Sequence, residues 1–255
     1  MAGPVLAPRP APDGVVIYAI GDVHGRLDLL LRLQALVAAD AARRRATRRI
    51  LVRLGDYIDR GPDSQRVLDH LVAPPPPGFE TVDLRGNHEQ LLLDFAADAG
   101  RGTRWLANGG LATLASYGLP VPVTDARPDH RSLLRLQDGL LSVLPRAHRD
   151  FLRGLPVWHR IGDYVFVHAG IRPGTPLAAQ DEADLLWIRE PFLSGNDDPG
   201  FVVVHGHSIS TIPQIRRNRI GIDTGAYATG VLTALAIEGD RLDLIQTSPA
   251  TGPRA

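Results

Sequence analysis

Two glycine-flanked segments of the chain combine acidic, imidazole and guanidinium side chains. In GDVHG, Asp22 and His24 are two residues apart, so a carboxylate oxygen and an imidazole nitrogen could bind one metal ion. In GDYIDRG, the chain adds Asp56, Asp59 and Arg60. Each segment alone is a weak signal, because an aspartate in a turn more often caps the backbone.

The same residue types follow apolar runs further along the chain. GNHE contains Asn87 and His88, VHAG contains His168, and VVVHGHS contains His205 and His207. A lone histidine at the end of a buried strand is more often a core or rim residue than a ligand. Buried polar groups without partners are costly, however, and one shared metal cluster would satisfy them together. The joint pattern therefore predicts a metal centre.

The composition limits how such a centre can be built. The chain has 255 residues and contains no Cys, which excludes thiolate ligands, disulfides and a cysteine nucleophile. Oxygen and nitrogen ligands suit several divalent transition metals. Mn²⁺ is the expected ion, with Fe, Zn or Co as alternatives. The formal net charge of +0 indicates no general attraction to nucleic acid or to an anionic membrane.

Buried strands must position these residues. Short apolar runs, each ending in Gly, Asp, Asn or His, predict strands at 15–20, 50–54, 79–84, 164–167 and 201–204. Helical spacing of apolar residues predicts helices at 27–42 and 64–72. Alternating strands and helices are typical of a partly parallel α/β sheet, in which ligands bind at the strand ends.

The rest of the chain is organised around this unit. We predict a single domain at 15–248, a flexible Pro-rich leader at 1–14 and a frayed tail at 249–255. Residues 89–155 are rich in Leu and Ala and are interpreted as a helical insertion beside the site.

Alternating apolar and polar residues near the end of the chain predict antiparallel strands that close a second sheet, in RIGIDTG, VLTALAIEG and RLDLIQT. No segment approaches the roughly 18 consecutive apolar residues that a membrane span needs. The leader also lacks the pattern of a signal peptide, so we expect a cytoplasmic location.

The ordered series GDVHG, GDYIDRG, GNHE, VHAG and HGHS resembles the calcineurin-like metallophosphoesterases, specifically the PPP-type phosphoprotein phosphatases in their bacterial and phage form. The motifs span Gly21 to Ser208, and the following IGIDTGAYATGVLTALAIEG also resembles that branch. The resemblance implies an α/β fold: a four-layer αββα sandwich of two mixed β-sheets with flanking helices and two metal ions at the strand ends.

The resemblance also implies a role for each residue. The first metal would be held by Asp22, His24 and Asp56, and the second by Asp56, Asn87, His168 and His207. Asp56 would then bridge the two ions. Ile209 stands where many relatives outside the PPP branch have a further metal-binding histidine, in agreement with the PPP pattern. His205 would not be a ligand but a residue at the rim or behind the ligands.

Two closely spaced cations could clamp a bridging hydroxide for in-line attack on phosphorus, so no phosphoenzyme would be needed. Arg60 could donate paired hydrogen bonds to phosphate oxygens, and Arg189 in LLWIREPF and Asn87 are further candidates for phosphate binding. Arg189 could equally lie on a surface rim. His88 resembles the family's general acid, oriented by the carboxylate of Asp59.

These expectations describe a metal-dependent phosphomonoester hydrolase, in particular a serine/threonine phosphoprotein phosphatase, with dual specificity as a further option. Its partners would be a phosphorylated protein or peptide, or a small phosphate ester, with no membrane and no nucleic acid. The alternative is a symmetrical dinucleoside tetraphosphate hydrolase, in which the position of Asp59 is typically not Asp.

Two further readings rank lower. An inactive scaffold of the same fold is disfavoured because every expected ligand is present. The run RRRATRR at 43–49 could bind nucleic acid, but a solvated helix C-terminus explains it more simply.

Overall fold

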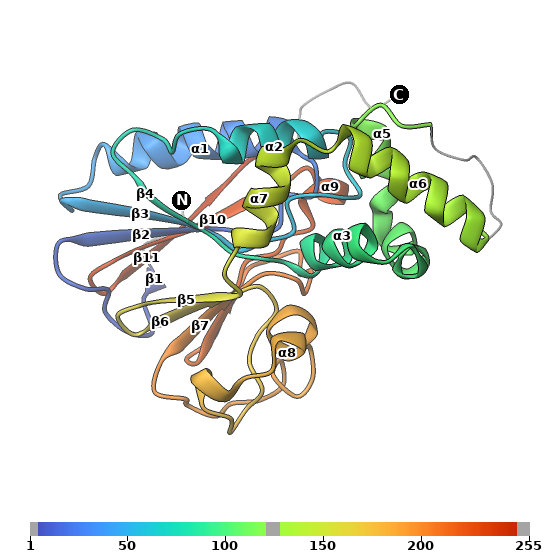
Figure 1. Cartoon of the computed structure of the whole chain (residues 1–255). Coiled ribbons are helices and arrows are strands. Elements are labelled where there is room, and N and C mark those ends of the chain that lie inside the picture. Colours follow the sequence, from blue (N-terminus) through green and yellow to red (C-terminus); the bar gives the residue numbers. More distant parts are fainter. Residues whose placement is uncertain (1–4, 121–127, 249–255) are drawn as a thin grey trace.

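The computed structural model describes residues 5–120 and 128–248. Two mixed sheets pack face to face between layers of helix, which confirms the predicted αββα fold class. Figure 1 shows α1 (Leu27–Ala41) and α2 (Ser64–Val72) above the first sheet and α8 (Glu182–Trp187) below the second. The fourth layer is small, because it consists of α8 and the loops around it.

The first sheet has six strands and carries the first three motifs, GDVHG, GDYIDRG and GNHE. Its order is β1 (Val5–Leu6), β11 (Arg241–Gln246), β10 (Thr233–Glu238), β2 (Val15–Ile20), β3 (Arg48–Arg53) and β4 (Glu80–Asp83). β2, β3 and β4 are parallel, so their carboxyl ends lie at one edge of the sheet. β10 runs antiparallel to β2 on its other side.

The second sheet has five strands and carries the last two motifs. Its order is β5 (Trp158–Ile161), β6 (Tyr164–Val167), β7 (Val202–His205), β9 (Arg219–Gly221) and β8 (Gln214–Ile215). β6, β7 and β9 are parallel, and antiparallel β5 and β8 lie at the two edges.

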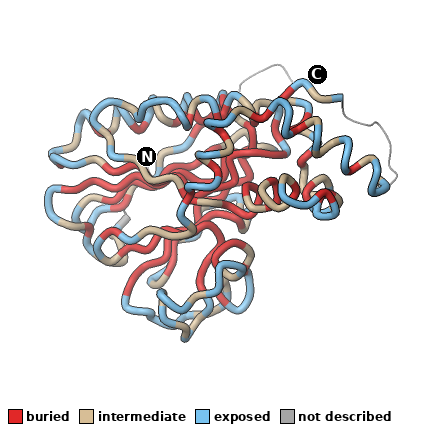
Figure 2. Tube along the Cα trace, in the orientation of Figure 1, coloured by how far each residue is buried: buried red, intermediate tan, exposed pale blue. Residues whose placement is uncertain are grey.

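Strand alternation divides the core into layers. Ile17 of β2 lies in the core between the sheets together with Phe166 of β6. Tyr18 points the other way and packs with α1. On the outer face of the second sheet, Val203 packs with Phe192 and the residues of α8. Buried residues accordingly concentrate in the strands, while the outer sides of the helices are exposed (Figure 2).

Short helices fill the stretch that was interpreted as a helical insertion. They are α3 (Asn87–Ala97), a 3-10 turn at Ala99–Arg101, α4 (Gly102–Trp105), a π turn at Leu106–Gly110, α5 (Leu111–Ser116), α6 (His130–Val143) and α7 (Arg146–Gly154). A further 3-10 turn is at Leu177–Ala179, and α9 is at Ala226–Thr229.

The C-terminal strands differ from the prediction. RIGIDTG forms β9 of the second sheet, but VLTALAIEG and RLDLIQT form β10 and β11 of the first sheet. Apolar alternation shows that one face of a strand is buried, but it does not show which sheet the strand joins. β10 belongs to the first sheet because it pairs with β2 on one side and β11 on the other, while its Leu235 and Ile237 face the core between the two sheets.

The predicted flexible leader also needs correction. Residues 5 and 6 form β1 and pair with β11, Ala11 is buried in the core between the sheets, and Tyr164 donates a hydrogen bond to the carbonyl oxygen of Arg9. Residues 5–14 are therefore packed onto the domain. Residues 1–4 and the predicted tail at 249–255 lie outside the described residues.

The arginine run at 43–49 is compensated by acidic residues. Arg44 forms ion pairs with Asp40, Glu238 and Asp243. Arg48 pairs with Glu80 across the first sheet. These contacts give much of the run a structural role. Within the described part of the chain, no helix is long and apolar enough to cross a membrane.

Candidate metal centre

The strand ends bring the predicted ligands into one buried region. Two groups of side chains have potential ligand atoms within 4.8 Å of one another. The groups are His24, Asp56 and His88, and Asp56, His168 and His207. Because Asp56 belongs to both, its carboxylate lies between two possible metal positions, as a bridging ligand would.

The hydrogen bonds of two histidines leave a nitrogen lone pair directed at Asp56. Nδ1 of His24 donates to the carbonyl oxygen of Ile58, and Nδ1 of His168 donates to that of Leu54, each at 2.9 Å. In the neutral rings, Nε2 then carries the lone pair. These Nε2 atoms lie 3.5 and 3.4 Å from oxygens of Asp56. Both rings are thus prepared to bind a cation beside a carboxylate.

Burial keeps these rings neutral. It lowers the pKa of His24 to about 3 and also lowers that of His168. Burial, followed by the effect of His168, lowers the pKa of His207 to about 3. Metal binding requires deprotonated imidazole, so these directions suit ligands. Nε2 of His24 is also a buried nitrogen without a hydrogen-bond partner among the described residues.

Asn87 lies where two histidines meet. Its Oδ1 is 2.8 Å from Nε2 of His168 and 2.9 Å from Nδ1 of His207. The Asn oxygen and the Nε2 lone pair are both acceptors, so a bound cation would make this close approach favourable. The residues present therefore fit a metal held by oxygen and nitrogen.

Asp22 lies beside these two groups rather than in them. Its carboxylate accepts a hydrogen bond of 3.0 Å from the backbone nitrogen of His207. Burial, together with the charges of Asp223 and Asp56, raises the pKa of Asp22 well above its usual value. Three carboxyl groups are thus buried together, an arrangement that nearby cations would stabilise.

The backbone is unusual at the same positions. Among the described residues other than glycine, positive φ angles occur at His24, Asp56, Asp59, Arg60 and His207. Residues with a side chain disfavour this left-handed region, and such positions cluster at functional sites. Every one of the five is a predicted site residue, which supports a functional origin for the conformation.

Asp59 and His88 form a buried pair beside the metal positions. Nδ1 of His88 lies 2.7 Å from Oδ2 of Asp59. The Asp59 carboxylate also accepts hydrogen bonds from Nε1 of Trp105 at 3.0 Å and from the hydroxyl of Thr113 at 2.6 Å. Burial acts to lower the pKa of His88, but the charge of Asp56 and the hydrogen bond with Asp59 outweigh it, so the pKa is raised.

One of the two predicted arginines, Arg60, lies against His88. Nη2 of Arg60 is 3.1 Å from Nε2 of His88, and its guanidinium lies 4.9 Å from the ring centre of Tyr227. A Cβ at Gly109, where φ is 101°, would lie 2.9 Å from Cγ of Arg60, so glycine makes room for this arginine. Arg189 is exposed, and its charge lowers the pKa of both His168 and His207.

His205 is the histidine that the structure separates from the ligand groups. Its ring packs against Phe192 with ring centres 5.1 Å apart, on the outer face of the second sheet. This position is consistent with the expectation that His205 is not a ligand.

Sequence reasoning missed several supporting residues. Glu89 is buried and accepts hydrogen bonds from the backbone nitrogens of Asp56, Tyr57 and Gly86. Its place at the third position of α3 is a capping signal that could have been read from GNHE. Trp105 and Thr113 lie 46 and 54 residues from Asp59, and no local spacing connects them to it.

Comparison with known proteins agrees with this geometry. Residues 15–232 match the profile of the calcineurin-like phosphoesterase family. Serine/threonine-protein phosphatase 1 of Salmonella typhimurium is 37% identical over 235 residues, covering 87% of this chain and 92% of that protein. The symmetrical bis(5'-nucleosyl)-tetraphosphatase of Methylococcus capsulatus is 30% identical over 195 residues, covering 73% of this chain and 54% of that protein.

Among solved structures, a candidate diadenosine tetraphosphatase superposes with a TM-score of 0.62 at 22% identity, covering 95% of this chain and 97% of that one. At this identity the likeness concerns the fold.

Proposed function

The chain belongs to the calcineurin-like phosphoesterase family of metal-dependent hydrolases, and from this we propose that it is a phosphomonoesterase acting on phosphoserine or phosphothreonine in proteins. Phosphotyrosine and small phosphate esters are further substrates that the same machinery could process. The observation that carries the proposal is the buried pair of Asp59 and His88.

The two candidate reactions differ in what the leaving group needs. A serine or threonine alkoxide is a poor leaving group and must receive a proton as the ester bond breaks. The nucleotide released from a dinucleoside tetraphosphate leaves as a stabilised phosphate anion. A histidine whose pKa is raised and whose Nδ1 is held by Asp59 supplies the proton that only the first reaction requires.

The proposed ligand sets are those expected from the sequence. One ion would be held by Asp22, His24 and Asp56, and the other by Asp56, Asn87, His168 and His207. When bound, two divalent cations activate water and neutralise charge on the phosphoryl group. Mn²⁺ is our proposal for the ion, because oxygen and nitrogen ligands without thiolate accept it readily. We retain a cytoplasmic location as a prediction from the sequence.

The protein's own groups would perform the remaining steps. Arg60, together with Arg189 and the amide of Asn87, would bind and orient the non-bridging phosphate oxygens. His88 would donate the proton from Nε2 to the leaving oxygen, while Asp59 holds Nδ1 and stabilises the positive charge of the ring before transfer. No side chain needs to form a covalent phosphoenzyme.

A direct comparison of substrates tests the proposal. The protein with added manganese should hydrolyse phosphoserine and phosphothreonine peptides with a higher kcat/KM than a symmetrical dinucleoside tetraphosphate. The tetraphosphate is included because the relative in Methylococcus capsulatus is a symmetrical tetraphosphatase, although the match covers only 54% of that protein. A tenfold preference for the tetraphosphate would replace our proposal with that activity.

A further inference from the structure

A pocket lined by several polar side chains opens on the outer face of the second sheet. It has a volume of about 220 Å³ and is lined by His205, Ser208, Ser210, Arg216 and Arg219, among others. None of these is a proposed metal ligand, although Ser208 directly follows His207.

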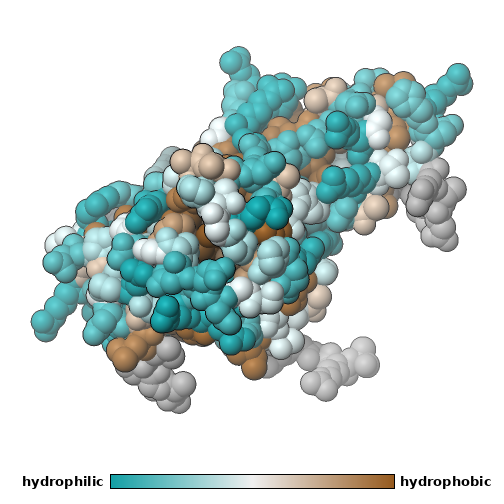
Figure 3. All heavy atoms as spheres, turned by 90° about the horizontal axis from the view of Figure 1, so that it is seen from below, coloured by the Kyte–Doolittle hydropathy of each residue, from teal (hydrophilic) through white to brown (hydrophobic). Residues whose placement is uncertain are grey.

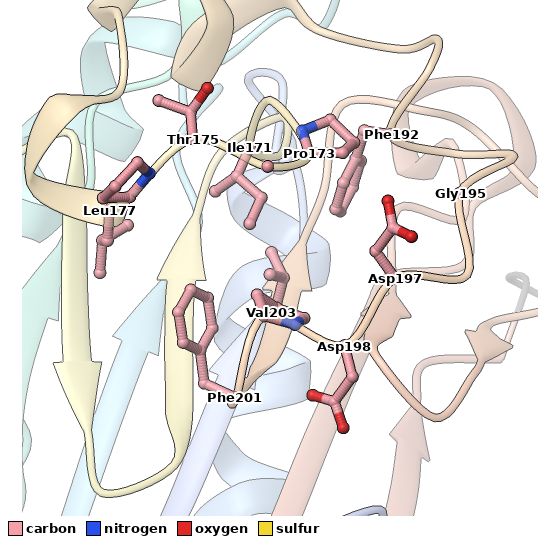
Figure 4. A pocket seen from close by; sticks show the side chains of 13 residues that line it. Ile171, Pro173, Thr175, Leu177, Phe192, Gly195, Asp197, Asp198, Phe201 and Val203 are labelled. Atoms are coloured by element: carbon pink, nitrogen blue, oxygen red, sulfur yellow. The ribbon is translucent and has the colours of Figure 1, made fainter.

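A neighbouring pocket is lined by other residues. It measures about 350 Å³ and is lined mainly by apolar residues, including Ile171, Leu177 and Phe201 (Figure 4). Viewed from below, apolar residues are recessed among hydrophilic ones on this side of the molecule (Figure 3). Phe192 lines this apolar pocket and also packs against His205 and Arg219, which line the polar one.

Two buried polar atoms of the polar pocket have no hydrogen-bond partner among the described residues. They are Nε2 of His205 and the hydroxyl oxygen of Ser208. His205 is 2% exposed, and its Nδ1 donates to the carbonyl oxygen of Gly206 at 3.1 Å. In the neutral ring, Nε2 is therefore an acceptor that requires a donor. A Cβ at Gly221 would lie 3.0 Å from this nitrogen, so a side chain at position 221 would crowd the His205 ring.

The same pocket carries excess positive charge. Arg219 is buried and donates hydrogen bonds to the carbonyl oxygens of Leu193 and Gly195, which orient its guanidinium without neutralising it. Burial lowers the pKa of Arg219 and the charge of Arg216 lowers it further, with Glu190 acting in the opposite direction. An anion between the two guanidinium groups would relieve this repulsion.

We propose that this pocket binds inorganic phosphate in its protonated form. Arg216 and Arg219 would bind the charged oxygens, the hydroxyl of Ser208 would donate to a third, and Nε2 of His205 would accept the hydrogen bond of the P–OH group. Inorganic phosphate keeps at least one such proton near neutral pH, whereas sulfate has none. Phosphate is also the product of any phosphomonoester hydrolysis, so product could bind at this pocket as well as at the metal centre.

Counting bound phosphate tests the proposal. Equilibrium dialysis of the manganese-loaded protein against radiolabelled phosphate, at constant ionic strength, should detect a second phosphate in addition to the one expected at the metal centre. Arg216→Gln should weaken the second site about tenfold or more, because it removes a charge-assisted hydrogen bond. Arg217→Gln is the matched control, since Arg217 is exposed and pairs with Asp198 at 3.6 Å outside the pocket. It should bind phosphate as the wild type does.

Competition separates phosphate from other anions. Sulfate and phosphoserine, whose dianion lacks the P–OH group, should displace phosphate from the second site at least tenfold less effectively than unlabelled phosphate. Hydrolysis of an aryl phosphate by Arg216→Gln should stay within twofold of the wild type. The dialysis does not depend on which phosphoester is the substrate, so failure of the proposed function would not mimic failure here. Equal phosphate binding by Arg216→Gln and the wild type, whether one or two phosphates bind per chain, would overturn the proposal, and so would equal competition by sulfate.

Discussion

Oδ2 of Asp59 lies 2.7 Å from Nδ1 of His88, and both side chains are buried beside the metal positions. We expect Asp59→Asn and His88→Asn each to retain metal but to lose turnover of alkyl phosphates by about 10² to 10⁴-fold, because the leaving alkoxide no longer receives its proton. Turnover of an activated aryl phosphate should fall much less. Metal content and kcat on both substrates are the measurements, and unchanged turnover of the alkyl phosphate in either variant would defeat the assignment.

Thr113 fixes the other oxygen of Asp59, so its hydroxyl should matter for the same step. Thr113→Val should lower kcat on phosphopeptides roughly tenfold, because loss of a hydrogen bond to a charged group costs about 1.5 to 3 kcal/mol. Thr113→Ser keeps the hydroxyl and should recover most of the activity. Steady-state kinetics check this: equal kcat in the Val and Ser variants would show that the hydrogen bond from Thr113 does not contribute to this step.

Trp105 offers a second donor to Asp59 and can be tested separately. Trp105→Phe removes Nε1 but keeps an aromatic ring against Phe95, whose ring centre lies 5.1 Å away. We expect kcat on alkyl phosphates to fall while KM stays within about twofold, since the change acts through His88. A rise in KM alone would indicate that Trp105 serves substrate binding instead.

Metal removal should affect stability as well as activity. A ligand that binds only the folded state adds about 2.7 kcal/mol when present at 100 times its Kd. For a chain of this size, that corresponds to a rise in Tm of roughly 5 to 10 °C on adding manganese to chelator-treated protein. Asp56→Asn should abolish most of this rise, because Asp56 belongs to both ligand groups. Calorimetry would contradict this prediction if manganese raised the Tm of the variant as much as that of the wild type.

The contacts of His148 with Asp69 and Tyr117 predict that the stability of the protein depends on pH. His148 is buried, with Nδ1 2.7 Å from the Tyr117 hydroxyl and Nε2 3.0 Å from Asp69, and burial lowers its pKa. In the unfolded chain the pKa of His148 is about 6.5. Between that pH and the lower pKa of the folded state, the unfolded chain therefore binds more protons than the folded chain. The stabilisation by neutral His148 is therefore present above about pH 6.5 and is lost as the pH falls towards the folded pKa.

His148→Gln tests this dependence directly. The variant should unfold at a lower temperature than the wild type at pH 7.5, and the gap should narrow as the pH falls from about 7 to 5. Thermal unfolding at fixed manganese concentration measures it. A gap that is constant over this range would mean that the protonation of His148 does not contribute.

Most candidate ligands could be predicted from the sequence because they follow a buried strand with a clear apolar pattern, as Asp22 follows β2 and His168 follows β6. Asn87 follows β4, which is only partly buried. The support of Asp59 by Thr113 could not, since that contact depends on how the short helices pack over the first sheet. The sequence also could not predict which sheet β10 joins, because a strand shows the same alternation of apolar and polar residues in either sheet. Likewise, a Pro-rich segment gave no sign that residues 5 and 6 pair with β11.

The pairing of β10 with β2 has a consequence for how the chain is made. β2, which leads into Asp22 and His24, has β3 on one side and gains its second neighbour only from residues 233–238. While the ribosome is still synthesising those residues, β2 is an open edge with unpaired amides, able to pair with another nascent chain. The strand that leads into Asp22 and His24 is thus completed late, and a chain cut short before β10 would leave it unpaired on one side.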